Sequence, residues 1–147
     1  MGCYLPPRKF LRSKNYFKVN NLMPKLNIII PLVIYPFDVM VSIGQTDKEL
    51  SLELLKYGIE DISELILSET TRGRTIMFEG NQTVIRLKTF DVAVLCHECF
   101  HAVVFILSKV GIPLKVMKSD EAYAYLLEYL VGEVVKRVKN RHKCNNK

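Results

Sequence analysis

The sequence lacks the cysteine pattern of a disulfide-stapled protein. Its four cysteines are two isolated residues near the ends, Cys3 and Cys144, and one close pair, Cys96 and Cys99. A small extracellular domain held by disulfides would have a denser and more regular set. A structural zinc site built from four cysteines would need a second close pair, which this chain does not have. The cysteine usage therefore favours reduced thiols and a cytoplasmic protein, with Cys96 and Cys99 as small packing residues.

Acidic residues are missing from both ends of the chain. Residues 1–27 and 136–147 each hold six basic residues and no acid, so the net charge of +6 arises at the ends. Basic ends of this kind are usually solvated, and no nucleic-acid-binding motif accompanies them. Nucleic acid is therefore an unlikely partner, although the basic ends leave it open. We expect a disordered extension over 1–22, one domain over 23–139 and a basic tail over 140–147.

The sequence also lacks a secretory signal and a convincing membrane span. Residues 1–27 contain no apolar core of the length that a signal peptide needs. Asp91 and Lys109 confine the most apolar stretch to fewer than the roughly 20 residues that cross a bilayer. We therefore expect a soluble protein without a membrane partner.

Turn and capping residues divide the remaining chain into short elements. Residues 59–73 have no clear pattern. The other expected elements are an extended or edge-strand segment over 28–43, a capped helix from 46 to about 57, a hairpin of 75–78 and 83–88, an apolar helix from 89 or 91 to 109, and an amphipathic helix from 120 to about 139.

Histidine is scarce, and two of the three histidines lie in the stretch Cys96–His101. His97 and His101 are four residues apart, so a helix places their imidazoles on adjacent turns, where they can bind one metal ion. Glu98 lies beside them, close enough to hold a water on that ion. His-Glu-x-x-His on a helix is the pattern of zinc hydrolases. The alternative, two core histidines without a metal, is costly because it buries polar groups.

A catalytic zinc usually has three protein ligands, so the histidine pair needs one more. The glycine and third histidine of the elongated form of the motif are absent here, and His142 lies in the basic tail. A carboxylate on the last helix is the other common solution. Glu121, 20 residues after His101, is the first candidate, and Glu128 on the same face is the reserve.

A zinc ion bound there would lower the pKa of its water towards about 7 and polarise a substrate carbonyl. Glu98 would then act as general base and pass the proton to the leaving amine. Tyr123, Tyr125 and Tyr129 are candidates for stabilising the oxyanion, and Tyr125 is the one we carry forward. The alternative function is a non-catalytic, metal-stabilised binding or regulatory module, which would have no need of Glu98.

Two stretches, His97-Glu98-Cys99-Phe100-His101 and Glu121-Ala122-Tyr123-Ala124-Tyr125, resemble the zincin metallopeptidases of the gluzincin type. They look similar to the small ImmA/IrrE-like peptidases of phages and mobile elements and to the minimal gluzincins. The resemblance implies an α+β, zincin-like fold, in which a small, twisted, mostly antiparallel sheet packs on an active-site helix and an antiparallel C-terminal helix. It also implies a protein or peptide substrate, Zn²⁺ held by His97, His101 and Glu121, and Glu98 as general base.

Overall fold

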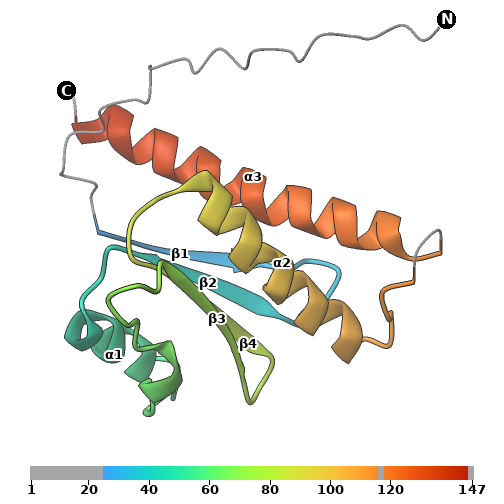
Figure 1. Cartoon of the computed structure of the whole chain (residues 1–147), viewed down its shortest axis with the longest axis horizontal. Coiled ribbons are helices and arrows are strands. Elements are labelled where there is room, and N and C mark those ends of the chain that lie inside the picture. The colour runs from blue at the N-terminus through green and yellow to red at the C-terminus, as the bar shows by residue number, and fades with distance from the viewer. Residues whose placement is uncertain (1–24, 116–117, 146–147) are drawn as a thin grey trace, which may run out of the picture.

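A four-stranded sheet forms the centre of the molecule, with helices on both of its faces (Figure 1). The computed structural model describes residues 25–115 and 118–145, so the expectation for residues 1–22 lies outside the described part. The elements in chain order are β1 (Leu26–Pro31), β2 (Asp38–Ile43), α1 (Asp47–Leu55), the short 3₁₀ helix η1 (Ser63–Leu65), β3 (Gly73–Phe78), β4 (Gln82–Leu87), α2 (Val92–Lys109) and α3 (Asp120–Asn145).

The sheet has the strand order β1-β2-β4-β3. The pairs β1–β2 and β3–β4 are antiparallel hairpins, and the central pair β2–β4 is parallel. The fold is therefore α+β with a mixed sheet in which antiparallel pairs predominate. The zincin-like form of that fold stays a prediction.

The predicted β3–β4 hairpin is confirmed. Its three-residue connection, 79–81, reverses the chain through Gly80 and Asn81, whose φ angles of 77° and 65° lie in the left-handed region that glycine and asparagine tolerate. The expected extended segment over 28–43 is two strands. β1 ends at Pro31, and the chain reverses through a loop closed by the Leu32 N–H, which donates to the Phe37 carbonyl at 3.1 Å.

Alternation along the strands sends apolar side chains into two separate cores. The larger core lies between the sheet and the α2–α3 pair, and it includes Ile30, Val41, Ile85, Leu95 and Leu130. The smaller core lies on the opposite face, where Met40 and Val84 pack against α1 and η1. Because α2 and α3 cover the same face, the helix that carries the histidine pair is supported by both the sheet and α3.

Capping residues set the starts of α1 and α2, and the one at α1 is the capping box that the sequence predicts. Thr46 and Glu49 form a complete capping box at α1, and the Asp91 carboxylate accepts the Ala93 and Val94 N–H groups at the start of α2. α3 begins at Asp120, as expected, but continues six residues beyond Lys139 to Asn145. The basic tail that we expected over 140–147 is thus helical through Asn145.

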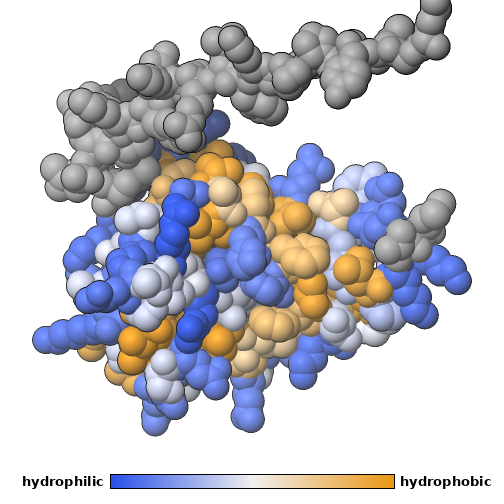
Figure 2. Space-filling model, viewed as in Figure 1, coloured by the Kyte–Doolittle hydropathy of each residue, from blue (hydrophilic) through white to orange (hydrophobic). Residues whose placement is uncertain are grey.

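α2 is long and apolar enough to cross a membrane by length and composition alone. In this structure it packs against β3, β4 and α3. Apolar side chains remain visible over α2, beside α3, in the space-filling view (Figure 2).

Candidate metal centre

The imidazoles of His97 and His101 meet on the exposed side of α2. Their Nε2 atoms are 3.2 Å apart, and their rings stand nearly perpendicular, with centroids 4.8 Å apart. Both residues are exposed, so they are not core histidines satisfied by buried partners. The pair arises because α2 places residues four apart on one side and because its apolar residues face the sheet and α3.

The spacing of the two nitrogens suits a shared zinc ion. Two nitrogen ligands at about 2.0–2.1 Å from a tetrahedral zinc lie about 3.3 Å from each other. The separation of 3.2 Å between His97 Nε2 and His101 Nε2 is within about 0.1 Å of that value. The distance is also that of a hydrogen bond between the two rings, so it is compatible with a shared zinc ion and equally with an imidazole–imidazole hydrogen bond.

Glu98 lies beside the pair but turns toward the sheet. It is 5% exposed, and its Oε2 accepts a hydrogen bond from the Thr75 hydroxyl at 2.8 Å. The same hydroxyl lies 3.0 Å from the Glu98 carbonyl oxygen. The second carboxylate oxygen, Oε1, lies near the backbone of Gly73, where an added Cβ would be 3.1 Å away. Two features of β3 therefore hold Glu98 in place. The Thr75 hydroxyl donates a hydrogen bond to its carboxylate, and Gly73 has no side chain that would collide with it.

An open groove of about 370 Å³ borders these residues, between the chain that leads into β3 and the first turns of α2. His97 and Glu98 form part of its wall, and Arg72 and Gly73 lie opposite. Arg72 is fixed there by an ion pair with Asp91, the residue that caps α2. The groove offers a substrate-sized space in contact with one imidazole and the carboxylate.

The structure does not bring a third ligand to the histidine pair. Within residues 25–115 and 118–145, no three His, Cys, Asp or Glu residues are grouped closely enough to hold a metal ion. Glu121 and Glu128 are both exposed on α3. α3 runs along one flank of α2, whereas Glu98 contacts β3 on the other flank (Figure 1). Their assignment as metal ligands stays a prediction.

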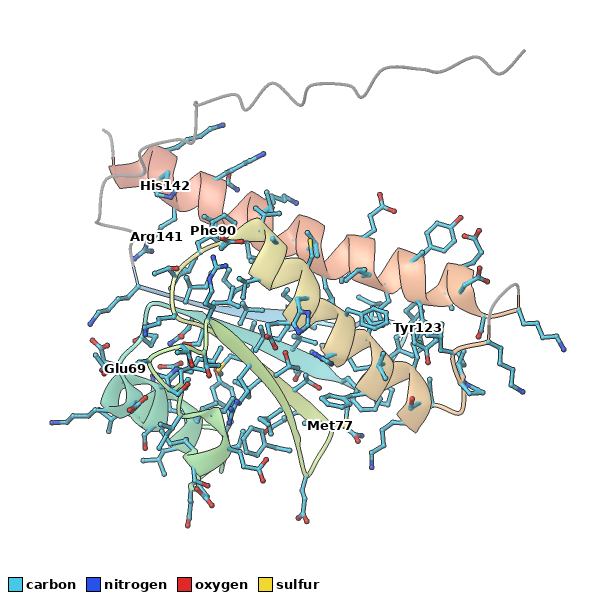
Figure 3. The ribbon with its side chains drawn as sticks, in the orientation of Figure 1. Glu69, Met77, Phe90, Tyr123, Arg141 and His142 are labelled. Atoms are coloured by element: carbon cyan, nitrogen blue, oxygen red, sulfur yellow. The ribbon has the colours of Figure 1, made fainter. Side chains whose placement is uncertain are left out.

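His142 also lies away from the His97–His101 pair. It lies in the last turns of α3, at the opposite end of that helix from Tyr123 (Figure 3).

The three tyrosine candidates for an oxyanion partner have different surroundings. Tyr123 is buried, and its hydroxyl donates to the Ile112 carbonyl at 2.9 Å, so it fixes the loop that joins α2 to α3. Tyr125 and Tyr129 are exposed and line a second groove, formed by α3 and the β1–β2 loop. Neither lines the groove that His97 borders. The role of Tyr125 as an oxyanion partner stays a prediction.

Cys99 has the packing character that the sequence predicts for both cysteines of α2, whereas Cys96 is only half-buried. Cys99 is fully buried, and this burial, reinforced by the neighbouring Cys96 and Glu98, raises the pKa of its thiol to about 12. A thiol with that pKa stays protonated near neutral pH. Cys99 fills the core.

Sequence reasoning missed Thr75 and Gly73, the residues that hold Glu98. Both lie on β3, two positions apart, on the strand face that meets α2. The strand alternation gave a usable signal, because a threonine at an inward position of a predicted strand needs a buried polar partner.

No protein-family model, curated protein or solved structure matches this chain.

Proposed function

We propose that the protein is a zinc-dependent hydrolase that cleaves peptide bonds, with His97 and His101 as metal ligands and Glu98 as general base. The separation of 3.2 Å between the two Nε2 atoms is the observation that supports this most directly. Two exposed imidazoles at a distance that suits a shared metal ion, with a buried carboxylate at the next position, form the donor set that the motif predicts.

The residues divide the chemistry as follows. A bound zinc ion would supply Lewis acidity, which polarises a substrate carbonyl and acidifies a water. Glu98 Oε2 accepts the Thr75 hydroxyl, so Oε1 would be the oxygen that accepts the proton of the attacking water and passes it to the leaving amine. The groove beside His97 holds the substrate chain, and β3, an edge strand, is available to pair with it.

The third ligand in this proposal is Glu121, with Glu128 in reserve. Glu121 lies in the first turn of α3, directly after the connection from α2. The Glu121→Gln variant tests this assignment.

Zinc binding is the first experiment. The wild-type protein is incubated with zinc, freed of excess metal, and its zinc content is measured beside His97→Ala, Glu98→Gln and Glu121→Gln. His142→Ala is the matched control, because it removes the one histidine that lies at the far end of α3. We expect about one zinc per chain in the wild type, Glu98→Gln and His142→Ala, a loss in His97→Ala, and weaker binding in Glu121→Gln.

Peptidase activity is then measured on an unfolded protein substrate. Glu98→Gln should retain zinc and lose cleavage by at least about a hundredfold, since general-base catalysis is worth about 10²–10⁴-fold. Wild-type protein that is folded but takes up no zinc would overturn the proposal. Zinc bound equally well by wild type and His97→Ala would also overturn it. Zinc retained without any cleavage would instead favour the non-catalytic binding module.

A further inference from the structure

One side of α3 carries a stripe of exposed residues that the proposed chemistry leaves largely unexplained. Its members recur every three or four residues, so they share one face of the helix. They are Glu121, Tyr125, Glu128, Gly132, Lys136, Lys139 and Lys143, and all are exposed. The buried residues Tyr123, Leu130 and Val134 lie on the other side of α3, in the main core. The stripe therefore faces away from the core that the described residues form.

The stripe is self-complementary about its central residue, Gly132. Glutamates precede the glycine and lysines follow it, at equal distances along the helix. The matching pairs are Glu128 with Lys136 at four residues, Tyr125 with Lys139 at seven, and Glu121 with Lys143 at eleven. If the α3 helix of a second copy packed antiparallel against this one, with the two Gly132 residues in contact, each glutamate would lie opposite a lysine of the other copy. Two-fold symmetry makes each such pair occur twice.

Nothing in the described part of the chain explains why position 132 of this helix is a glycine. A glycine in the interior of a helix costs about 1 kcal/mol relative to alanine. An added Cβ at Gly132 would meet no atom within 4 Å, so no neighbour in the described fold requires its absence. A glycine on an exposed helix face does allow another backbone to approach closely.

Apolar surface continues the stripe at its N-terminal end. Tyr125 is 67% exposed and Tyr129 is 43% exposed. Beside them, Val33 and Ile34 of the β1–β2 loop are 94% and 84% exposed. These four side chains line a groove of about 410 Å³. Exposed aromatic and aliphatic side chains next to ordered charges are typical of protein–protein interfaces.

We propose that this protein forms a symmetric dimer in which the α3 helices of two copies pair antiparallel and cross at Gly132. A second copy fits better than an unrelated partner because the charge order of the stripe is complementary to itself. The proposal does not depend on the metal. It does give Glu121 and Glu128 a role without zinc, so a dimer that forms equally in metal-free protein separates the two roles.

Sedimentation of the full chain under metal-free conditions tests the dimer. We expect wild type to dimerise, and to do so more weakly in high salt, because exposed charge pairs are screened. Glu128→Lys alone and Lys136→Glu alone each place like charges opposite each other at two points. Each should raise the dimer dissociation constant by about tenfold or more. Glu60→Lys and Lys48→Glu, exposed positions far from the stripe, make the same changes of net charge and should leave the dimer intact.

Mixing the two disrupted variants gives the sharpest test. Antiparallel pairing predicts that a Glu128→Lys chain and a Lys136→Glu chain form a heterodimer, since both contacts between them again join opposite charges. The double variant Glu128→Lys/Lys136→Glu should likewise recover the homodimer. A mixture that stays as weakly associated as its components would overturn the proposed register.

Gly132→Leu provides a test that leaves the charges in place. The added side chain meets no atom within 4 Å at its Cβ, so the monomer should be at least as stable as wild type to thermal unfolding. The dimer should weaken, because the helices can no longer approach at the glycine. Wild-type protein that is monomeric at about 100 µM, or a Gly132→Leu variant that dimerises as well as wild type, would overturn the proposal; so would capture of a different protein by a monomeric wild type.

Discussion

Thr75 and Glu98 are joined across the boundary between the sheet and α2 by a hydrogen bond of 2.8 Å between Thr75 Oγ1 and Glu98 Oε2. Both residues are buried, so this hydroxyl supplies what water would otherwise supply to the carboxylate. Its single proton is shared between that oxygen and the Glu98 carbonyl, 3.0 Å away. The conformation of the proposed general base is thus determined by a residue on a different element.

Replacing Thr75 by valine should destabilise the protein. The shape is nearly preserved, but the buried carboxylate loses its donor, which costs about 1–3 kcal/mol. Urea unfolding of Thr75→Val measures this loss. Thr75→Ser keeps the hydroxyl and removes only a methyl group, so its free energy of unfolding should decrease less than that of Thr75→Val. Equal losses in the two variants would show that the methyl group, and not the hydrogen bond, matters.

Two glycines should respond in opposite ways to alanine. At Gly73 an added Cβ would lie 2.8 Å from Val94 Cγ1 and 2.9 Å from Glu98 Cγ, closer than real contacts allow. Gly73→Ala should therefore cost about 1–3 kcal/mol as α2 is pushed from β3. Gly132→Ala meets nothing within 4 Å and should stabilise the helix by up to about 1 kcal/mol. Thermal unfolding of both variants checks the sign of each change.

Asp91 should contribute to stability chiefly as a helix cap. Its Oδ1 accepts the Ala93 and Val94 N–H groups at 2.9 and 3.1 Å, and the Val94 bond is the main cause of its lowered pKa. Asp91→Ala should lower the free energy of unfolding by about 1 kcal/mol. Asp91→Asn should retain most of that stability, because asparagine is an equally good cap. If Asp91→Asn lowers the free energy of unfolding as much as Asp91→Ala does, the ion pair with Arg72 contributes more to stability than the cap.

Acid should weaken the start of α1 in a defined pH range. The Lys25 ammonium, followed by the Thr46 N–H and hydroxyl, lowers the pKa of Glu49 from 4.5 to about 2. A carboxyl whose pKa is lower in the folded state stabilises the fold above its unfolded pKa, and that stabilisation is lost as the pH falls towards the folded pKa. The stability difference between wild type and Glu49→Gln should therefore be largest above pH 4.5 and shrink towards pH 2.

The control for that measurement is Glu60→Gln. Glu60 is exposed and takes part in no side-chain hydrogen bond or ion pair among the described residues. Its stability difference from wild type should stay nearly constant over the same pH range. A Glu49→Gln difference that is equally flat would contradict the capping role.

Local signals in the sequence predicted the helices and one hairpin well. The caps at Thr46 and Asp91 and the Gly80–Asn81 turn each act within a few residues, so their neighbours alone determine the outcome. The β1–β2 hairpin was not separated into two strands, because the turn between Pro31 and Asp38 is a longer loop without a two-residue signature.

The candidate site was predictable only where it depends on one helix. His97, Glu98 and His101 are placed by helical periodicity, and the structure brings the two imidazoles together as expected. The contact of Glu98 with Thr75 joins residues 23 positions apart and depends on how α2 crosses the sheet. The position of Glu121 depends in turn on the connection between two helices, which no periodicity determines.

The parallel pairing of β2 with β4 has a consequence for the order of folding. Each antiparallel hairpin closes a short loop, whereas β2 and β4 meet only after α1, η1 and β3 have been bridged. Contacts between distant segments form slowly because the entropy of closing the loop is lost before they can form. The core under α2 draws on β1, β2 and β4 together, so it is complete only when the two hairpins have paired. The groove beside His97 is lined by residues 70–98 alone, so its walls belong to a continuous part of the chain that needs no pairing between the hairpins.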